Sequence, residues 1–209
     1  MPIVTALRRG RGRRFLVYLD GHFAFALGGE VTAGLAVGNE LSDAEIDALL
    51  GSNLAHRCHV AALRLLTYRP RSRTELQQGL LRRGFPATAV EAELERLAQQ
   101  GLVDDIAFAR MWRDSREGTS PRSARLLQRE LHRKGVDPEA AVEATRGLDD
   151  EAAAYRAALK KASRWASLGY PVFRRRAGGF LSRRGFSYEV VRRTVDRLWQ
   201  EAHTPPPEE

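Results

Sequence analysis

Three short stretches of this 209-residue sequence match one another when they are aligned on a glycine. They read Leu80-Leu81-Arg82-Arg83-Gly84-Phe85, Leu131-His132-Arg133-Lys134-Gly135-Val136 and Leu181-Ser182-Arg183-Arg184-Gly185-Phe186. The glycines lie 51 and 50 residues apart. Fourteen residues before each stands a proline (Pro70, Pro121, Pro171), and thirteen residues after each stands a leucine (Leu97, Leu148, Leu198). A register kept three times indicates an internal repeat of about 50 residues.

Each repeat carries the start and stop signals of helices. The residues before the glycine have the apolar spacing of a helix, and basic residues in its last turn suit the negative end of the helix dipole. The glycine suits the left-handed position that ends many helices. A second helix is expected to begin near Pro86, Asp137-Pro138 or Ser187, and a further helix precedes each proline. The repeat unit is therefore predicted to contain three helices.

Paired aspartates mark two of the helix starts, in Leu102-Val103-Asp104-Asp105 and Leu148-Asp149-Asp150. A carboxylate at this position can cap a helix and favour its positive end. The same pairs could be metal ligands or acid–base groups, but no His or Cys of matching spacing accompanies them, so we favour capping. Ser72 and Glu75 stand three residues apart at the start of a predicted helix, and we interpret them as a capping box.

The N-terminal residues have a different pattern. Residues 14–27 alternate between apolar and polar on either side of Asp20-Gly21, which predicts a β-hairpin with a type I′ turn. Residues 3–7 could add a third strand. Ser42-Asp43-Ala44-Glu45 resembles a capping box that opens a short helix ending at about Leu50.

These patterns predict a mainly α fold of three tandem three-helix repeats in an elongated, curved array, preceded by a small β element. The expected divisions are an N-terminal hairpin with a short helix at 1–53, repeats at 54–104, 105–149 and 150–202, and a disordered tail at 203–209. Trp112 and Trp165 lie at helical spacing with other apolar residues and are expected in the core.

Composition excludes several classes of protein. Hydrophobic residues make up 43% of the chain and charged residues 29%, which is ordinary for a globular protein. No apolar run approaches the roughly 20 residues of a membrane span, and the N-terminus has no signal-peptide core. A single cysteine, Cys58, excludes an internal disulfide framework. The protein is therefore expected to be cytoplasmic and not to associate with membranes.

Positive charge is concentrated near the C-terminus. The net charge is +8, and residues 150–200 hold 12 basic and 4 acidic groups, whereas residues 1–53 hold 5 and 6. Such asymmetry suggests a surface that meets phosphates or an acidic protein, although charge runs are often only a solvated face. The candidate contact residues are Arg174, Arg175, Arg176, Arg183, Arg184, Arg192 and Arg193, with Arg71, Arg122 and Arg125 as further candidates.

No catalytic or cofactor motif accompanies these arginines. His56, Cys58 and His59 match no four-ligand zinc spacing. Gly28-Gly29 and Gly178-Gly179 lack the pattern of a phosphate loop, and no nucleophile and base share a recognisable signature. The sequence therefore predicts a binding protein without a metal or cofactor, and not an enzyme.

Three motifs resemble those of the RecX regulatory proteins. Leu65-Leu66-Thr67-Tyr68-Arg69-Pro70-Arg71-Ser72-Arg73-Thr74-Glu75-Leu76 is similar to that family's Leu-x-x-x-Arg-x-Arg-Ser-x-x-Glu-Leu signature. Gly101-Leu102-Val103-Asp104-Asp105-Ile106-Ala107-Phe108-Ala109, with Trp112 and Arg116 following, resembles its Asp-Asp block. Glu130-Leu131-His132-Arg133-Lys134-Gly135-Val136 resembles its Glu-Leu-x-x-Lys-Gly-Ile block, with Val136 in place of Ile. The third repeat lacks these landmarks in full.

This resemblance implies a monomeric, non-enzymatic modulator of the RecA recombinase. Such proteins lie along the RecA–single-stranded-DNA filament and usually inhibit its ATPase, strand-exchange and SOS coprotease activities. Two other functions stay open on the residues alone. One is a helix-turn-helix transcription factor that binds DNA directly, and the other is a passive helical scaffold for an acidic protein.

Overall fold

The computed structural model describes residues 1–203, in which a three-stranded sheet precedes nine helices. The antiparallel sheet has the order β1 (Val4–Arg9), β2 (Arg14–Leu19) and β3 (His22–Gly28). The helices of this part are α1 (Asp43–Tyr68), α2 (Arg73–Leu81), α3 (Ala87–Gln99), α4 (Asp105–Thr119), α5 (Ala124–Arg133), α6 (Pro138–Thr145), α7 (Asp150–Ala166), α8 (Tyr170–Arg183) and α9 (Tyr188–His203). The fold is mainly helical, with three helices in each repeat, as the sequence predicts.

The chain divides into two compact units. The first contains Met1–Arg71 and Leu76–Val103, and the second contains Ser72–Glu75 with the described residues from Asp104 onward. The first unit has two buried clusters, one under the sheet and one among α1, α2 and α3. In the second unit, α4–α6 and α7–α9 each bury a cluster of their own. The predicted division into one N-terminal element and three repeat domains stays a prediction.

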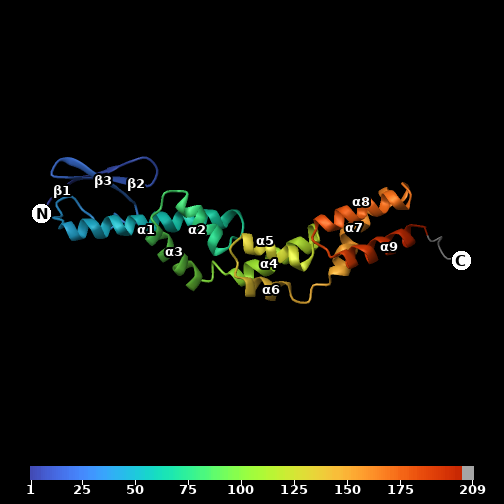
Figure 1. Cartoon of the computed structure of the whole chain (residues 1–209). Helices are drawn as coiled ribbons and strands as arrows, with labels where there is room; N and C mark the ends of the chain where they lie inside the picture. The colour runs from blue at the N-terminus through green and yellow to red at the C-terminus, as the bar shows by residue number, and fades with distance from the viewer. Residues whose placement is uncertain (204–209) are drawn as a thin grey trace, which may run out of the picture. The chain divides into compact units, whose positions relative to one another are not determined.

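The predicted hairpin and its turn at Asp20-Gly21 are present in the sheet. Asp20 and Gly21 both have positive φ angles, 47° and 82°, which is the geometry of a type I′ turn. The predicted third strand is β1, which pairs with β2. Val17 and Leu27 point into a cluster that includes Ile46 of α1, and Figure 1 shows the strands beside the N-terminal half of that helix. Packing on α1 supplies the apolar contact that a small sheet needs to be stable in water.

The prediction of a short helix ending at about Leu50 is wrong, because α1 continues without a break from Asp43 to Tyr68. The predicted capping box at its start is present, with Ser42 and Glu45 bonded in both directions. Gly51-Ser52-Asn53 has weak helix propensity. However, the buried Asn53 side chain accepts a hydrogen bond from the Gly28 amide at 2.9 Å and donates one to the Ala26 carbonyl at 3.3 Å. This tertiary tether to β3 compensates for the local preference.

The glycine of each repeat ends a helix in the left-handed conformation. Gly84, Gly135 and Gly185 have φ angles of 82°, 77° and 85°. The amide after each glycine donates to the carbonyl five residues earlier, as from Phe186 to Leu181 at 3.4 Å. This bond satisfies a carbonyl that the helix end would leave without a partner.

The paired aspartates cap two helices rather than one. Asp149 accepts from the amides of Glu151 and Ala152 and caps its own helix, α7. Asp150, the next residue, accepts from the amide of Ala124, the first residue of α5, at 2.9 Å. Asp104 and Asp105 repeat the arrangement, with the Asp105 carboxylate accepting from the backbone amide of Arg73, the first residue of α2, at 2.8 Å. The predicted capping role is confirmed, and the second aspartate also joins one repeat to the preceding one.

A serine and a glycine complete each junction inside the second unit. The Ser123 hydroxyl caps α5, while its amide donates to the Arg184 carbonyl at 3.1 Å. A Cβ atom added to Gly185 would lie 2.6 Å from Ser123 Oγ. Ser72 likewise accepts from the Glu75 amide at 3.1 Å and donates to the Lys134 carbonyl. Gly185 therefore ends α8 and, because it has no side chain, also leaves room for the start of α5.

The third repeat replaces the cap serine with an aromatic residue. Phe173 stands twelve residues before Gly185, where Ser123 precedes Gly135 by the same spacing, and its side chain is fully buried. The helix α8 accordingly begins earlier in the repeat, at Tyr170. His203 is the last residue of α9, so it is not part of a disordered tail, and residues 204–209 lie outside the described residues.

Candidate partner-binding surface

The predicted basic residues of the third repeat lie on α8 and α9. Arg174, Arg175 and Arg176 are consecutive and exposed, while Phe173 and Ala177 on either side of them are buried. Successive helix residues are about 100° apart, so the three arginines fan across the whole solvent side of α8. Helix α8 therefore packs one apolar face against the core and presents basic side chains on its exposed faces.

Arg174 and Arg192 meet at a cleft between α8 and α9. The cleft has a volume of about 350 Å³ and also contains Tyr170, Tyr188 and Asp196. The Tyr170 hydroxyl donates a 2.8 Å hydrogen bond to Asp196, and this bond raises the pKa of Tyr170. Tyr188 is 75% exposed. The cleft therefore offers two guanidinium groups beside an open aromatic ring.

Five arginines of this region are exposed and form no ion pair with any described residue. We call them the third-repeat surface: Arg174, Arg175, Arg176, Arg183 and Arg192. Arg125 of α5 is exposed and unpaired in the same sense, and it lines a hollow with Ser182 and Gly185 at the end of α8. Unpaired guanidinium groups can bind carboxylates or phosphates in a bidentate manner.

Two of the predicted arginines instead contact the chain itself. Arg184 donates to the Ser120 hydroxyl and the Pro121 carbonyl, each at 2.9 Å, and burial lowers its pKa. Arg193 pairs with Glu151 at 2.8 Å and with Glu189, and these contacts raise its pKa. Their role in binding a partner stays a prediction, but both side chains already have internal partners.

Arg122 belongs to a network around the buried carboxylate of Glu130. Arg122 and Arg116 both pair with this carboxylate, the latter at 3.2 Å, and the Trp112 indole donates to it at 3.0 Å. Burial, and then the nearby charges of Arg116 and Arg184, lower the pKa of Arg122. Trp112 is half-buried against the core of its repeat, as expected for a core residue, but its nitrogen serves this polar network.

Arg71 also bonds to its own unit. Its Nε donates a 2.9 Å hydrogen bond to the Leu65 carbonyl near the end of α1, and the side chain is half-buried. Because Leu65 stands in the last turn of α1, this bond caps the C-terminal end of that helix. A partner-binding role for Arg71 stays a prediction.

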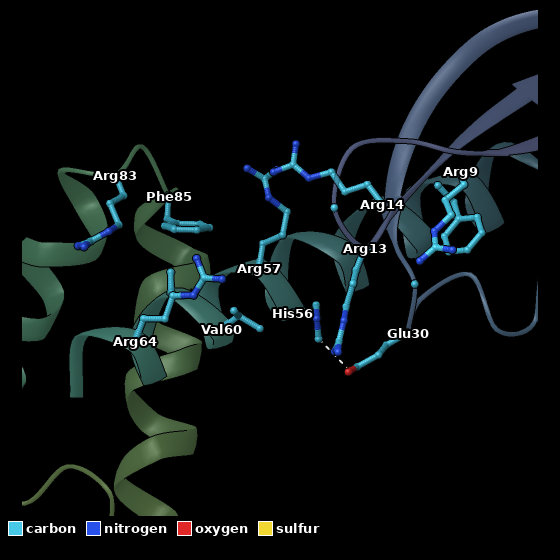
Figure 2. A pocket seen from close by; sticks show the side chains of 15 residues that line it. Arg9, Arg13, Arg14, Glu30, His56, Arg57, Val60, Arg64, Arg83 and Phe85 are labelled. Carbon is cyan, nitrogen blue, oxygen red and sulfur yellow. Dashed lines mark ion pairs between the residues drawn. The ribbon is translucent and has the colours of Figure 1, made fainter. Parts of the chain in front are cut away.

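A second basic region lies in the first unit, and the sequence interpretation did not include it. A groove of about 1290 Å³, which we call the arginine groove, lies between the sheet and α1. Figure 2 shows the side chains that line it. Six arginines line it: Arg9, Arg13, Arg14, Arg57, Arg64 and Arg83. All five basic residues of segment 1–53 lie within residues 8–14. The net charge of the whole segment is close to zero and therefore conceals this local cluster.

Other polar groups do not form a metal site in the part of the chain that the structure describes. Among residues 1–203, no three His, Cys, Asp or Glu side chains gather closely enough to hold a metal ion. His59 lies 2.7 Å from Glu93. Cys58 is fully buried, and desolvation raises the pKa of its thiol to about 11. None of the helices within 1–203 has both the length and the apolar character of a membrane span.

Comparison with known proteins agrees with the repeat structure. Family models for the first, second and third three-helix domains of RecX match residues 58–97, 104–144 and 149–195. Regulatory protein RecX of Thermobifida fusca is 37% identical over 166 residues, which cover 75% of this chain and 89% of that protein. Regulatory protein RecX of Mycobacterium avium is 41% identical over 133 residues, covering 62% and 77%.

Solved structures show the same fold. A crystal structure of regulatory protein RecX matches with a TM-score of 0.62 at 21% identity and covers 98% of this chain and 95% of that chain. A crystal structure of RecX from Lactobacillus salivarius gives 0.61 at 20% identity, covering 70% and 97%. The fold thus defines a helical-repeat protein whose surface is rich in unpaired arginine. The chain belongs to the RecX family.

Proposed function

We propose that this chain is a non-enzymatic regulator that binds the RecA–single-stranded-DNA filament and inhibits its ATPase, strand-exchange and coprotease activities. Membership of the RecX family supports a regulatory role. The protein acts as a monomer in the cytoplasm, and the DNA is reached directly or through the filament. No cofactor takes part.

The observation that carries the proposal is the third-repeat surface, whose five arginines are exposed without a carboxylate partner among the described residues. Like charges held this close favour an acidic partner, because they repel one another until a counter-charge arrives. A filament of protein and DNA offers both carboxylates and phosphates, which guanidinium groups bind well. Proteins built from stacked repeats commonly bind their partners through extended surfaces.

RecA ATP hydrolysis on circular single-stranded DNA tests this function. We expect the full chain to lower the rate, and the variant Arg174→Glu/Arg175→Glu/Arg176→Glu to need at least about tenfold more protein for the same effect. Three exposed charge contacts of about 0.5 kcal/mol each together give this factor. The variant should keep the wild-type helical circular dichroism, since all three side chains are exposed.

A charge-matched control separates a specific surface from net charge. Arg110, Lys160 and Arg164 are exposed and form no ion pair with described residues, and none lines the cleft between α8 and α9. Their triple change to Glu should leave inhibition unchanged. Equal inhibition by wild type and the α8 variant would overturn the assigned surface. No effect of the wild-type chain on RecA, together with a sequence-specific footprint on duplex DNA, would favour the transcription-factor alternative.

A further inference from the structure

The arginine groove has a large excess of positive charge. Of its fifteen lining residues six are arginine, whereas Glu30 is the one acidic member and lies 3.3 Å from His56 Nδ1. Arg83 donates to the Gly79 carbonyl at 2.9 Å. The side chains of the other five arginines are exposed and form no hydrogen bond or ion pair with any described residue. A set of cations that the fold does not neutralise indicates an anionic ligand.

Different elements converge on this groove. Arg9 and Arg13 come from the end of β1 and the turn that follows it, and Arg14 begins β2. Arg57 and Arg64 project from α1, and in Figure 2 the guanidinium groups of Arg14 and Arg57 extend toward one another. Two guanidinium groups facing each other across a groove, with no carboxylate drawn between them, form a natural clamp for one phosphate.

Along α1 the charges alternate with apolar surface. Arg57 and Arg64 are seven residues apart, so they lie on the same face of the helix about 10.5 Å apart. Val60 and Ala61 line the groove between them, and Phe15 and Phe85 contribute half-buried rings. Single-stranded nucleic acid needs both kinds of surface, because cations follow its phosphates and rings or apolar side chains receive its bases.

The size of the groove favours a polymer over a small anion. Its volume of about 1290 Å³ exceeds the roughly 300–1,000 Å³ of a typical small-molecule site. An acidic peptide would satisfy the arginines but would make no use of the rings and the apolar strip. We propose that the arginine groove binds a segment of single-stranded nucleic acid, with Arg14, Arg57 and Arg64 on its phosphates. The site needs no filament, so this proposal does not depend on the proposed function.

Direct binding to a fluorescein-labelled dT12 oligonucleotide tests the site. Anisotropy titrations use the full chain without RecA, at several salt concentrations. Each phosphate contact on a single strand contributes about −0.7 to the slope of log K against log salt, so the three proposed contacts would give about −2. In Arg14→Ala/Arg57→Ala the slope should become shallower by about 1.4, and the affinity at 0.1 M salt should fall about 25-fold. Circular dichroism checks that the exposed changes leave the fold intact.

The control variant is Arg82→Ala/Arg110→Ala, which removes the same charge from exposed positions outside the groove. It should bind dT12 within about twofold of wild type. An unlabelled dodecamer of glutamate should compete poorly with dT12. Wild-type binding by the groove variant would overturn the proposal, and so would effective displacement of dT12 by the glutamate peptide. The ATPase test of the proposed function uses RecA and a different set of variants. The groove proposal and the proposed function can therefore be refuted independently of each other.

Discussion

Changing Gly185 to alanine tests the junction between the second and third repeats. The residue has a φ of 85°, and occupying this region with a side chain costs about 1 kcal/mol. The added Cβ would also lie 2.6 Å from Ser123 Oγ and 2.7 Å from Leu126 Cβ. Carbon contacts are normally about 3.5–4.0 Å. Because Leu126 Cβ is fixed to the α5 backbone, no side-chain rotation relieves the overlap, and helix α5 has to move.

Overpacking of this kind costs about 1–3 kcal/mol. We therefore expect Gly185→Ala to lower the free energy of unfolding by about 2–4 kcal/mol in total. Gly147 provides the matched control, since its φ is 78° but nothing lies within 4 Å of an added Cβ. Gly147→Ala should cost only about 1 kcal/mol, the backbone part alone.

Urea denaturation followed by tryptophan fluorescence measures the free energy of unfolding of the second unit for both variants. The three tryptophans, Trp112, Trp165 and Trp199, all belong to the second unit, which also holds Gly147 and Gly185. The signal therefore reports this unit even if the first one unfolds separately. Equal destabilisation by the two alanine variants would refute the reasoning, because it would mean that the preceding helix start does not lie against Gly185.

Two further predictions concern buried polar groups. Glu130→Gln leaves Arg116 and Arg122 without their shared carboxylate, and because both are about a quarter exposed we expect a loss of roughly 2–3 kcal/mol in the same urea assay; a loss below about 0.5 kcal/mol would contradict the network. The raised pKa of Cys58 means that the unfolded chain releases this proton near pH 9 while the folded chain keeps it to about pH 11, so stability should fall as the pH rises through this window. Cys58→Ala should remove that part of the pH dependence, and a profile identical to wild type would show that the thiol does not contribute.

Local signals along the sequence are strong enough to predict the repeat. Each of Gly84, Gly135 and Gly185 follows a helical pattern, and the structure has all three in the left-handed conformation. The capping roles of Asp104 and Asp149 are equally local, because a carboxylate at a helix start reaches amides only two and three residues away. Features that depend on one or two turns of chain can be predicted because no distant residue is needed to form them.

The continuity of α1 and the state of the arginines are not local properties. Asn53 stays helical because its side chain bonds to a strand about 25 residues earlier. Arg184 looks identical to Arg183 in the sequence, yet only Arg184 meets the loop at Ser120 and Pro121, more than 60 residues away. The sum of charges over a segment cannot distinguish a cation that bonds to its own chain from one that awaits a partner.

The sequence by itself determined that this protein repeats a three-helix unit three times, that the helix before each repeat glycine ends there, and that a hairpin precedes the repeats, since periodicity, caps and turns act over a few residues. Only the tertiary structure decided which arginines of the third repeat are unpaired. It alone assembled the arginine groove, in which Arg14 and Arg57 come from elements 43 positions apart in the chain. The physical reason is that a binding surface depends on which side chains the packing of distant elements brings together, and on which of them the fold leaves without a counter-charge.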